Sequence, residues 1–243
     1  FQTALDVCNE LRRLASGLHT RPPAPRGGES ASIAVLPFVN RSREEEDEYF
    51  ADGLTDELLG VLAKIRGLRV AARSSSFTFK GRSVTVAEVG QTLNVATVLE
   101  GSVRKAGSRV RIAVQLVKVA DGYHLWSDTY DRTLDDIFAV QDDIAQSVVK
   151  ELRTALLGEQ QDSRASGEAR AEVAAAARGR GTDPEAHRLY LQGRFFAERM
   201  SKDDYERAAV CLQEALALDP GHALAWTQLS RTRLMQAGLG FAP

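Results

Sequence analysis

The hydrophobic period of the chain switches repeatedly between that of a strand and that of a helix from residue 32 to residue 158. Residues 33–38 (IAVLPF) form a short apolar run that is typical of a buried strand. Apolar residues then recur at helical spacing from Phe50 to Ile65, which predicts a helix that buries one face. A second strand is predicted over residues 68–72. This order restricts the segment to folds in which helices pack against a sheet.

Turn and cap signals divide the rest of this segment. Thr85 and Glu88 have the spacing of a capping box, which predicts the start of a helix that Asn94 can end. Three strands with short turns between them are predicted over residues 97–105, 109–119 and 123–131. A long helix is predicted to begin after Thr133. The predicted order is βαβα-βββ-α, an α/β domain with a mixed sheet over residues 32–158.

Segments of different composition flank this domain. Residues 17–31 are rich in Pro, Gly and Ser and are predicted to be a linker. Residues 159–182 lack a stripe of large apolar side chains and are predicted to be a second linker. Residues 183–243 predict a helical hairpin, connected at residues 200–204, and a third helix. Residues 1–16 predict a short amphipathic helix, which cannot fold alone.

Composition and charge exclude several classes of function. The net charge is −2 over 243 residues, and no segment is strongly basic, so nucleic acid is not an expected partner. No run of about 18 apolar residues occurs, so no membrane span is expected in this fragment. The chain begins with Phe1 rather than Met, and we expect it to be an internal piece of a longer protein.

The sequence carries no motif of catalysis or metal binding. It lacks the glycine-rich, His-Arg-Asp and Asp-Phe-Gly sequences of protein kinases, and it lacks a Gly-x-x-x-x-Gly-Lys phosphate loop. None of its histidines has a second His or a Cys at metal-ligand spacing. His187 and His222, for example, are expected on separate helices. We therefore predict no catalytic residue, no cofactor and no metal ligand in this fragment.

The most charged local feature is the hairpin predicted around residues 104–111. Its basic side chains are Arg104, Lys105, Arg109 and Arg111. One interpretation is an interaction surface for an acidic partner, RNA or phosphate. The other is the solvated face of a half-buried sheet, because Val103, Val110 and Ile112 alternate with the charges. This alternation favours the second interpretation.

The C-terminal helices carry small and large residues at fixed spacing. These residues are Gly193, Phe196, Ala208, Leu212, Ala215, Pro220, Trp226 and Leu229. In this pattern residues 183–243 resemble tetratricopeptide repeats, whose small residues let paired helices approach closely. The resemblance implies that the eight residues are structural packing positions. It also implies an incomplete array that continues beyond Pro243 and binds a protein or peptide on its concave surface.

Long segments of residues 32–158 carry a second resemblance. They are IAVLPF, YFADGLTDELLGVLAKIRGLRVAARSSSFTFKG, LEGSVRKAGSRVRIAVQLV and DGYHLWSDTYDRTLDDIFAVQDDIA. In this order they resemble the TolB-like domain of bacterial signalling proteins. Such domains are attached to adenylate cyclases, winged-helix regulators and serine/threonine kinases, and the resemblance implies no catalytic activity.

Residues 1–16 (FQTALDVCNELRRLAS) resemble the last helix of a bacterial serine/threonine protein kinase domain. Together the resemblances imply a non-catalytic regulatory and protein-interaction region of a bacterial signalling protein, with a kinase as the expected parent. ATP and Mg²⁺ are then expected only in an upstream kinase domain. The fragment is expected in the cytoplasm, or in the periplasm if a membrane span lies outside it.

Two alternatives to this function stay open. The first is an α/β domain that senses a ligand or nucleotide, with its site near residues 74–77 or 38–40, since α/β sheets often bind ligands at the carboxyl ends of strands. The second is an adaptor of a cyclase or of a transcriptional regulator with the same architecture.

Overall fold

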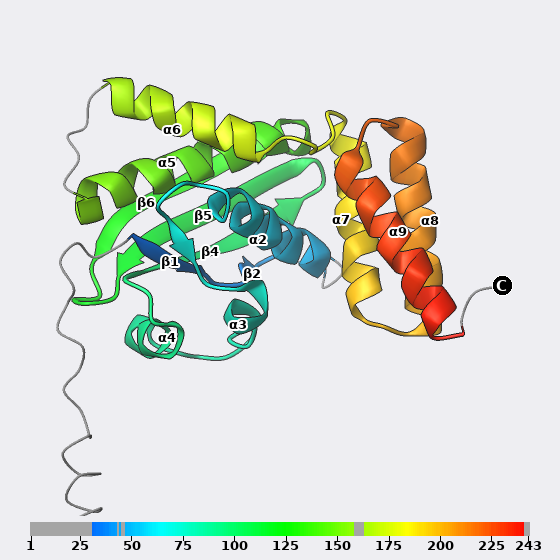
Figure 1. The fold of residues 1–243 in the computed structure, drawn as a ribbon, viewed down its shortest axis with the longest axis horizontal. Coiled ribbons are helices and arrows are strands. Elements are labelled where there is room, and N and C mark those ends of the chain that lie inside the picture. Colours follow the sequence, from blue (N-terminus) through cyan, green and yellow to red (C-terminus); the bar gives the residue numbers. More distant parts are fainter. Residues whose placement is uncertain (1–30, 43, 45–46, 158–162, 241–243) are drawn as a thin grey trace, which may run out of the picture.

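A computed structural model describes residues 31–42, 44, 47–157 and 163–240 of the chain. The helix predicted over residues 1–16 lies outside these residues, as does the linker predicted over 17–31 apart from Ala31. The described chain forms a mixed α/β unit followed by a group of helices (Figure 1). In this part of the chain, no helix is both long and apolar enough to cross a membrane.

Six strands form one mixed sheet. They are β1 (Ser32–Val35), β2 (Val39–Asn40), β3 (Arg69–Val70), β4 (Thr97–Ala106), β5 (Arg109–Lys118) and β6 (His124–Thr133). The order across the sheet is β3-β1-β4-β5-β6, and β2 pairs with β4. β1 runs parallel to both β3 and β4, whereas β4, β5 and β6 form an antiparallel meander. Because β1 lies between two strands, all four of its residues are buried.

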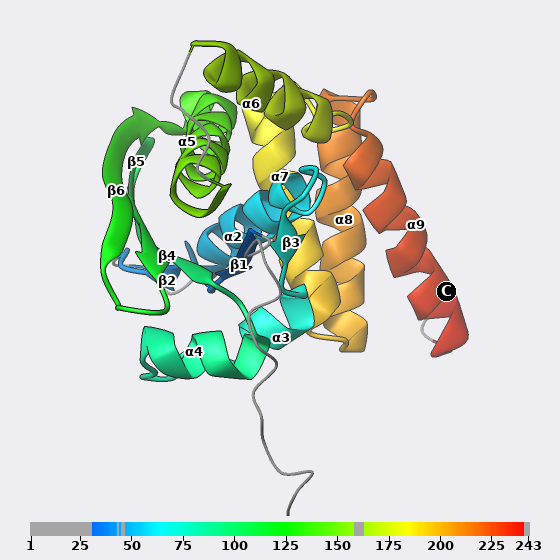
Figure 2. The ribbon, with the colours of Figure 1, turned by 60° about the vertical axis from the view of Figure 1, so that its left-hand side comes forward.

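Helices cover the two faces of the sheet unequally (Figure 2). The covering helices are α2 (Glu48–Leu62), α4 (Val86–Leu93) and α5 (Ile137–Leu157). α2 and α5 lie on one face over the larger core, which takes Ile33 and Val35 from β1. α4 lies on the other face, where Val89 packs with Ala34. Successive side chains of β1 therefore pack on opposite faces of the sheet, as the two-residue period of a strand requires.

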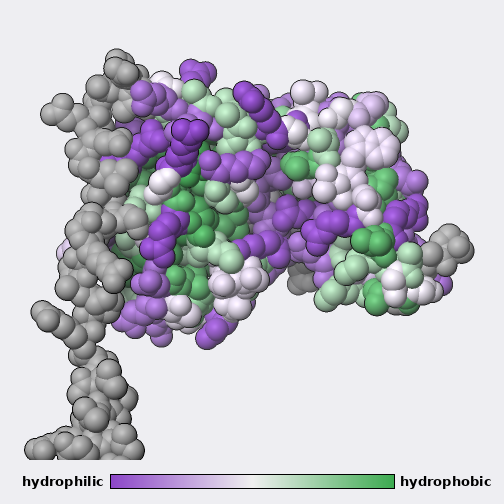
Figure 3. All heavy atoms as spheres, viewed as in Figure 1, coloured by the Kyte–Doolittle hydropathy of each residue, from purple (hydrophilic) through white to green (hydrophobic). Residues whose placement is uncertain are grey.

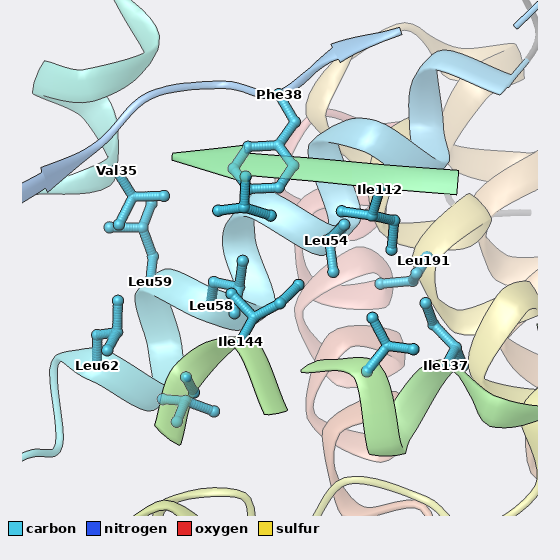
Figure 4. Packing of buried hydrophobic residues seen from close by; sticks show 14 of the residues in the cluster. Val35, Phe38, Leu54, Leu58, Leu59, Leu62, Ile112, Ile137, Ile144 and Leu191 are labelled. Carbon is cyan, nitrogen blue, oxygen red and sulfur yellow. The ribbon is translucent and has the colours of Figure 1, made fainter. Parts of the chain in front are cut away.

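The larger core is built around α2 (Figure 4). Leu54, Leu58 and Leu62 of α2 share this core with Ile112 of β5 and Ile144 of α5, and each of these side chains is less than 2% exposed. Burial of each such side chain contributes about 2 kcal/mol. α2 is buried along almost its whole length, since the sheet covers one side and other helices cover the rest.

The predicted cap of α4 is confirmed. The Thr85 hydroxyl accepts a hydrogen bond from the Glu88 backbone N–H at 3.2 Å, and the Glu88 carboxylate accepts one from the Thr85 N–H at 2.7 Å. Asn94 ends the helix in the left-handed conformation, with φ of 51°. At the later helix, one 3₁₀ turn follows Thr133 before α5 begins at Ile137.

The linker predicted over residues 159–182 requires correction, because it contains α6 (Ser163–Ala176). α6 packs on α5, and Ala169, Val173 and Ala176 are buried in the larger core. Residues 163–176 carry few large apolar side chains, but small ones suffice where a helix approaches its neighbour closely. Residues 163–176 are therefore part of the α/β unit.

Three further helices follow, namely α7 (Pro184–Glu198), α8 (Lys202–Leu218) and α9 (Ala223–Gly238). α7 and α8 lie side by side as a hairpin, with α9 beside them (Figures 1 and 2). The connection predicted at residues 200–204 is shorter than expected, because Ser201 caps α8 by accepting a hydrogen bond from the Asp204 N–H at 3.1 Å. Residues 202–204 therefore form the first turn of α8.

Two glycines allow the close helix contacts of this part. A Cβ at Gly193 of α7 would lie 2.8 Å from Leu212 Cγ and 3.0 Å from the Ala208 carbonyl oxygen, both in α8. A Cβ at Gly53 of α2 would lie 2.8 Å from Leu191 Cδ2 of α7. Leu191 is 1% exposed and belongs to the larger core, so α7 is packed directly onto the α/β unit.

Candidate functional site

An ion network around one buried carboxylate joins the α/β unit to α7. The Asp56 carboxylate on α2 accepts hydrogen bonds from Arg73 Nε at 2.5 Å and from Arg194 Nη2 at 2.6 Å. Glu198 of α7 pairs with Arg73 at 2.7 Å and lies 3.7 Å from Arg194 Nε. We call these four residues the Asp56 network. It links α2 and α3 (Arg73–Phe77), which are near each other in sequence, to α7, which lies more than a hundred residues later.

The carboxylates of this network depend on the two arginines to compensate their negative charge. The Asp56 side chain is 3% exposed and that of Arg194 is 21% exposed. Burial raises the pKa of Glu198, and the nearby Arg73 acts in the opposite direction. A buried carboxylate that loses its partners is left uncompensated, so the network fixes the position of α7 against α2. Figure 3 shows a band of hydrophilic residues where the two parts of the chain meet.

A cavity of about 450 Å³ lies beside the network, and we call it the junction cavity. Glu57, Lys64, Arg180 and Arg194 supply charged groups to its wall, and Leu224 of α9 supplies an apolar one. The cavity also reaches residues 70–73. It therefore adjoins residues 74–77, one of the two segments where the sequence predicts a ligand site if the domain is a sensor.

A groove of about 670 Å³ runs between α7 and α9, and we call it the helix groove. Arg194 of α7 and Gln228, Arg231 and Met235 of α9 line it, together with Arg73 of α3. Arg73 and Arg194 therefore belong both to the groove and to the Asp56 network. Hydrophobic side chains also reach the surface along α9 (Figure 3); Leu234 is 71% exposed and Met235 46%.

The residues predicted from the repeat pattern divide into buried and exposed positions. Ala208, Leu212 and Ala215 are fully buried in α8, Gly193 faces them, and Phe196 is 7% exposed. In contrast, Leu229 is only partly buried, Pro220 is exposed and Trp226 is 55% exposed. The indole N–H of Trp226 donates to the Pro220 carbonyl at 3.0 Å, which fixes the turn before α9.

The four basic residues of the predicted hairpin do not form one patch. Arg104, Arg109 and Arg111 are exposed, whereas Lys105 is half-buried and donates to Asp47 at 2.7 Å. Asp131 on β6 pairs with Arg111 at 2.5 Å and with Arg109 at 3.5 Å. Asp131 therefore compensates part of the positive charge, and these arginines hold its pKa below the usual range.

A second cavity, of about 580 Å³, lies on the sheet face that α4 covers. Leu36, Pro37 and Val39 line it. The cavity therefore adjoins residues 38–40, the other segment where the sequence predicts a ligand site if the domain is a sensor. Arg41, Lys80 and Glu100 are among its charged groups. No buried polar side chain without a partner is found in its described lining.

The structure contains a buried pair of histidines that the sequence alone does not reveal. His187 of α7 and His222, which caps α9, stack with ring centroids 6.0 Å apart and are at most 1% exposed. Both nitrogens of His187 lack a hydrogen-bond partner among the described residues. Burial, with help from His222 and Arg180, lowers the pKa of His187 to about 3. Spacing could not reveal this pair, since only the helix packing brings the two rings together.

Over the described ranges, no group of three or more His, Cys, Asp or Glu side chains could hold a metal ion. The stacked histidines are accompanied by Tyr190, whose ring lies 4.9 Å from that of His222, and by Phe138, whose ring lies 4.6 Å from that of His187. These contacts describe an aromatic cluster between α5, α7 and the start of α9.

Comparison with known proteins gives two sequence matches. The family model described as HilA/YgeH-like transcriptional regulator, second domain, matches residues 29–147. A curated relative in Rhizobium meliloti (strain 1021), named "Putative adenylate cyclase 3", is 40% identical over 208 residues. That alignment covers 86% of this chain but 33% of the relative, so the chain spans about a third of the relative's length.

Two solved structures are similar to about half of the chain. TolB from Acinetobacter baumannii is 14% identical with a TM-score of 0.39, over 51% of this chain and 28% of that chain. Lipoprotein GNA1162 from Neisseria meningitidis is 22% identical with a TM-score of 0.38, over 49% of this chain and 99% of that chain.

Proposed function

We propose that this chain is a non-catalytic regulatory and protein-interaction region of a larger bacterial signalling protein. The match to a domain of transcriptional regulators and the relative named as a cyclase support this proposal. They favour a nucleotide cyclase or a transcriptional regulator as the parent over the kinase that residues 1–16 imply. The residues behind the kinase interpretation lie outside the described part of the chain.

The observation that carries the proposal is the double role of Arg73 and Arg194. Both line the helix groove, and both hold Asp56 of α2. A protein segment seated in the groove would contact the side chains that fix α7 against the α/β unit. Binding and the position of the α/β unit would then be linked, since any group that binds one arrangement better shifts the balance toward it.

The proposed helical array would bind its partner as tetratricopeptide arrays do, along a concave surface. α7, α8 and α9 supply about one and a half repeats of such a surface. A cyclase or a transcriptional regulator works on intracellular nucleotide or on the chromosome, so the proposal places this region in the cytoplasm.

The proposal is tested in the source cell with a photo-crosslinking amino acid in the full parent protein. At Gln228, inside the groove, we expect covalent capture of one defined protein partner. At Gln213, exposed on α8, we expect none. An in-frame deletion of residues 31–240 should change the output of the parent, measured as cyclic nucleotide or as transcript. Equal crosslinking at both positions together with an unchanged output would refute the proposal.

A further inference from the structure

Glu57 on α2 is a buried carboxylate with no hydrogen-bond or ion-pair partner among the described residues. Glu57 is 8% exposed, and it lines the junction cavity. No described residue donates a hydrogen bond to it or forms an ion pair with it. Burial raises the pKa of Glu57, although Arg194 and Arg180 oppose that effect. A buried acidic group that is left unpaired is costly to the folded state, so its presence at a cavity requires an explanation.

The basic groups nearest to Glu57 are already engaged elsewhere. Arg194 donates to Asp56 at 2.6 Å, and Arg180 donates to both carboxylate oxygens of Asp142 at 3.0 Å. Lys64 Nζ donates to the Ala176 carbonyl at 2.6 Å. The wall therefore offers an unused hydrogen-bond acceptor at Glu57.

The charge of the lining sets a second requirement. Two acidic residues line the cavity with five basic ones, Lys64, Arg73, Arg178, Arg180 and Arg194. Arg178 is exposed and pairs with no acidic residue in the described part of the chain. A cationic ligand would meet this positive surplus unfavourably. A net anionic ligand that also offers N–H donors satisfies both the surplus and Glu57.

The remaining wall is apolar and sets the size of the ligand. Val61, Val70 and Leu224 lie among the lining residues. A volume of about 450 Å³ lies in the range of ordinary small-molecule sites, roughly 300–1,000 Å³. The site thus combines an apolar body, one free acceptor and a basic rim.

We propose that the junction cavity binds a small anionic molecule that donates N–H groups to Glu57 and places its anionic group near Arg178. Two kinds of metabolite share this chemistry, namely purine nucleotides and the acidic amino acids. The inference goes beyond the proposed function, because a partner could occupy the helix groove whether or not the cavity is filled.

The test measures thermal stability and heats of binding on the 243-residue chain. One arm uses 5′-AMP and 5′-GMP, and the other uses aspartate and glutamate singly. Adenosine, guanosine and inorganic phosphate serve as controls that carry only one half of the required chemistry. A binder at about 100 times its Kd should raise Tm by roughly 5 °C or more, and the half-ligands should not. No shift with any probe in either arm overturns the inference.

Variants then assign the site. Glu57→Gln keeps the shape but removes the charged acceptor, and we expect it to weaken binding at least about tenfold. Arg178 lies at the exposed rim, so Arg178→Ala should weaken binding without disturbing the fold. Glu206→Gln on α8, a matched change at an exposed residue, should leave Kd unchanged. Unchanged Kd in both Glu57→Gln and Arg178→Ala overturns the assignment, and the crosslinking at Gln228 is read independently of it.

Discussion

At the scale of single residues, the close helix contacts depend on glycines, which have no Cβ atom. Gly193→Ala would place a Cβ 2.8 Å from Leu212 Cγ and 3.0 Å from the Ala208 carbonyl. We expect this variant to lose about 1–3 kcal/mol of unfolding free energy in urea, because neither contact is the free end of a flexible chain.

Gly60→Ala is the matched control, since a Cβ there meets nothing within 4 Å and the residue lies inside α2. It should gain up to about 1 kcal/mol through helix propensity. If both variants gained stability, the close approach of α7 and α8 would be disproved.

The buried imidazole of His187 predicts a dependence of stability on pH. Its folded pKa is about 3, below the value near 6.5 of an unfolded chain. Between these two pH values only the unfolded chain binds a proton at His187. The contribution of the neutral imidazole to the free energy of unfolding is therefore complete above pH 6.5 and is lost as the pH falls toward 3. We expect a loss of about 2 kcal/mol at pH 5.

The measurement is urea unfolding at pH 7.5 and pH 5, compared between the wild type and His187→Phe. The variant should lose less stability between the two pH values, because Phe has no proton to bind. The comparison is needed because burial raises the pKa of Glu57, Glu198 and Asp52, and these groups act in the opposite direction over the same range. The same pH dependence in both proteins would contradict the prediction.

At the scale of elements, the cap of α4 is a local and separable contribution. Thr85→Ala removes the hydroxyl that accepts from the Glu88 N–H and should cost about 1 kcal/mol in thermal or urea unfolding. Thr154→Ala removes a hydroxyl that donates to the Lys150 carbonyl inside α5, so no cap is lost. That control should be neutral or slightly stabilising, and an equal loss in both variants would argue against the cap.

The elements that sequence alone predicts well are those fixed by local chemistry. The capping box at Thr85 and the strand alternation around Val110 follow from neighbours within a few residues. The sequence does not predict α6, because its buried face is made of Ala169, Val173 and Ala176, two of which are small and weakly hydrophobic.

The residues of the candidate site cannot be grouped from the sequence for a different reason. Asp56, Glu57, Arg180 and Arg194 are spread over more than a hundred positions, and only the docking of α7 on α2 brings them together. Glu57 looks like an ordinary polar residue of a helix until α7 and the end of α6 enclose it. No spacing rule describes such a contact.

At the scale of the whole molecule, the Asp56 network should make the two parts unfold together. The chain has two tryptophans, Trp126 on β6 and Trp226 on α9, so Trp126→Phe and Trp226→Phe each leave one reporter. With the network intact, both reporters should give the same midpoint in urea. Two separate midpoints in the otherwise unchanged chain would contradict this.

Asp56→Asn should separate those transitions and lower stability by about 1–3 kcal/mol, because the partly exposed Arg73 and Arg194 lose a buried counter-charge but keep Glu198. The Trp226 transition should move to lower urea than the Trp126 transition. Glu185→Gln, which breaks the exposed pair with Arg188, should cost less than about 1 kcal/mol and leave the transitions together.

The central place of β1 in the sheet has a consequence for the order of folding. β4, β5 and β6 are joined by tight turns and can pair as soon as they leave the ribosome. β1 is made first, yet its partners begin only at Arg69 and Thr97. Pairs that distant in sequence form slowly, since the intervening chain must first be closed into a loop. We therefore expect the strand synthesised first to be inserted last, with its apolar residues unprotected until the meander exists.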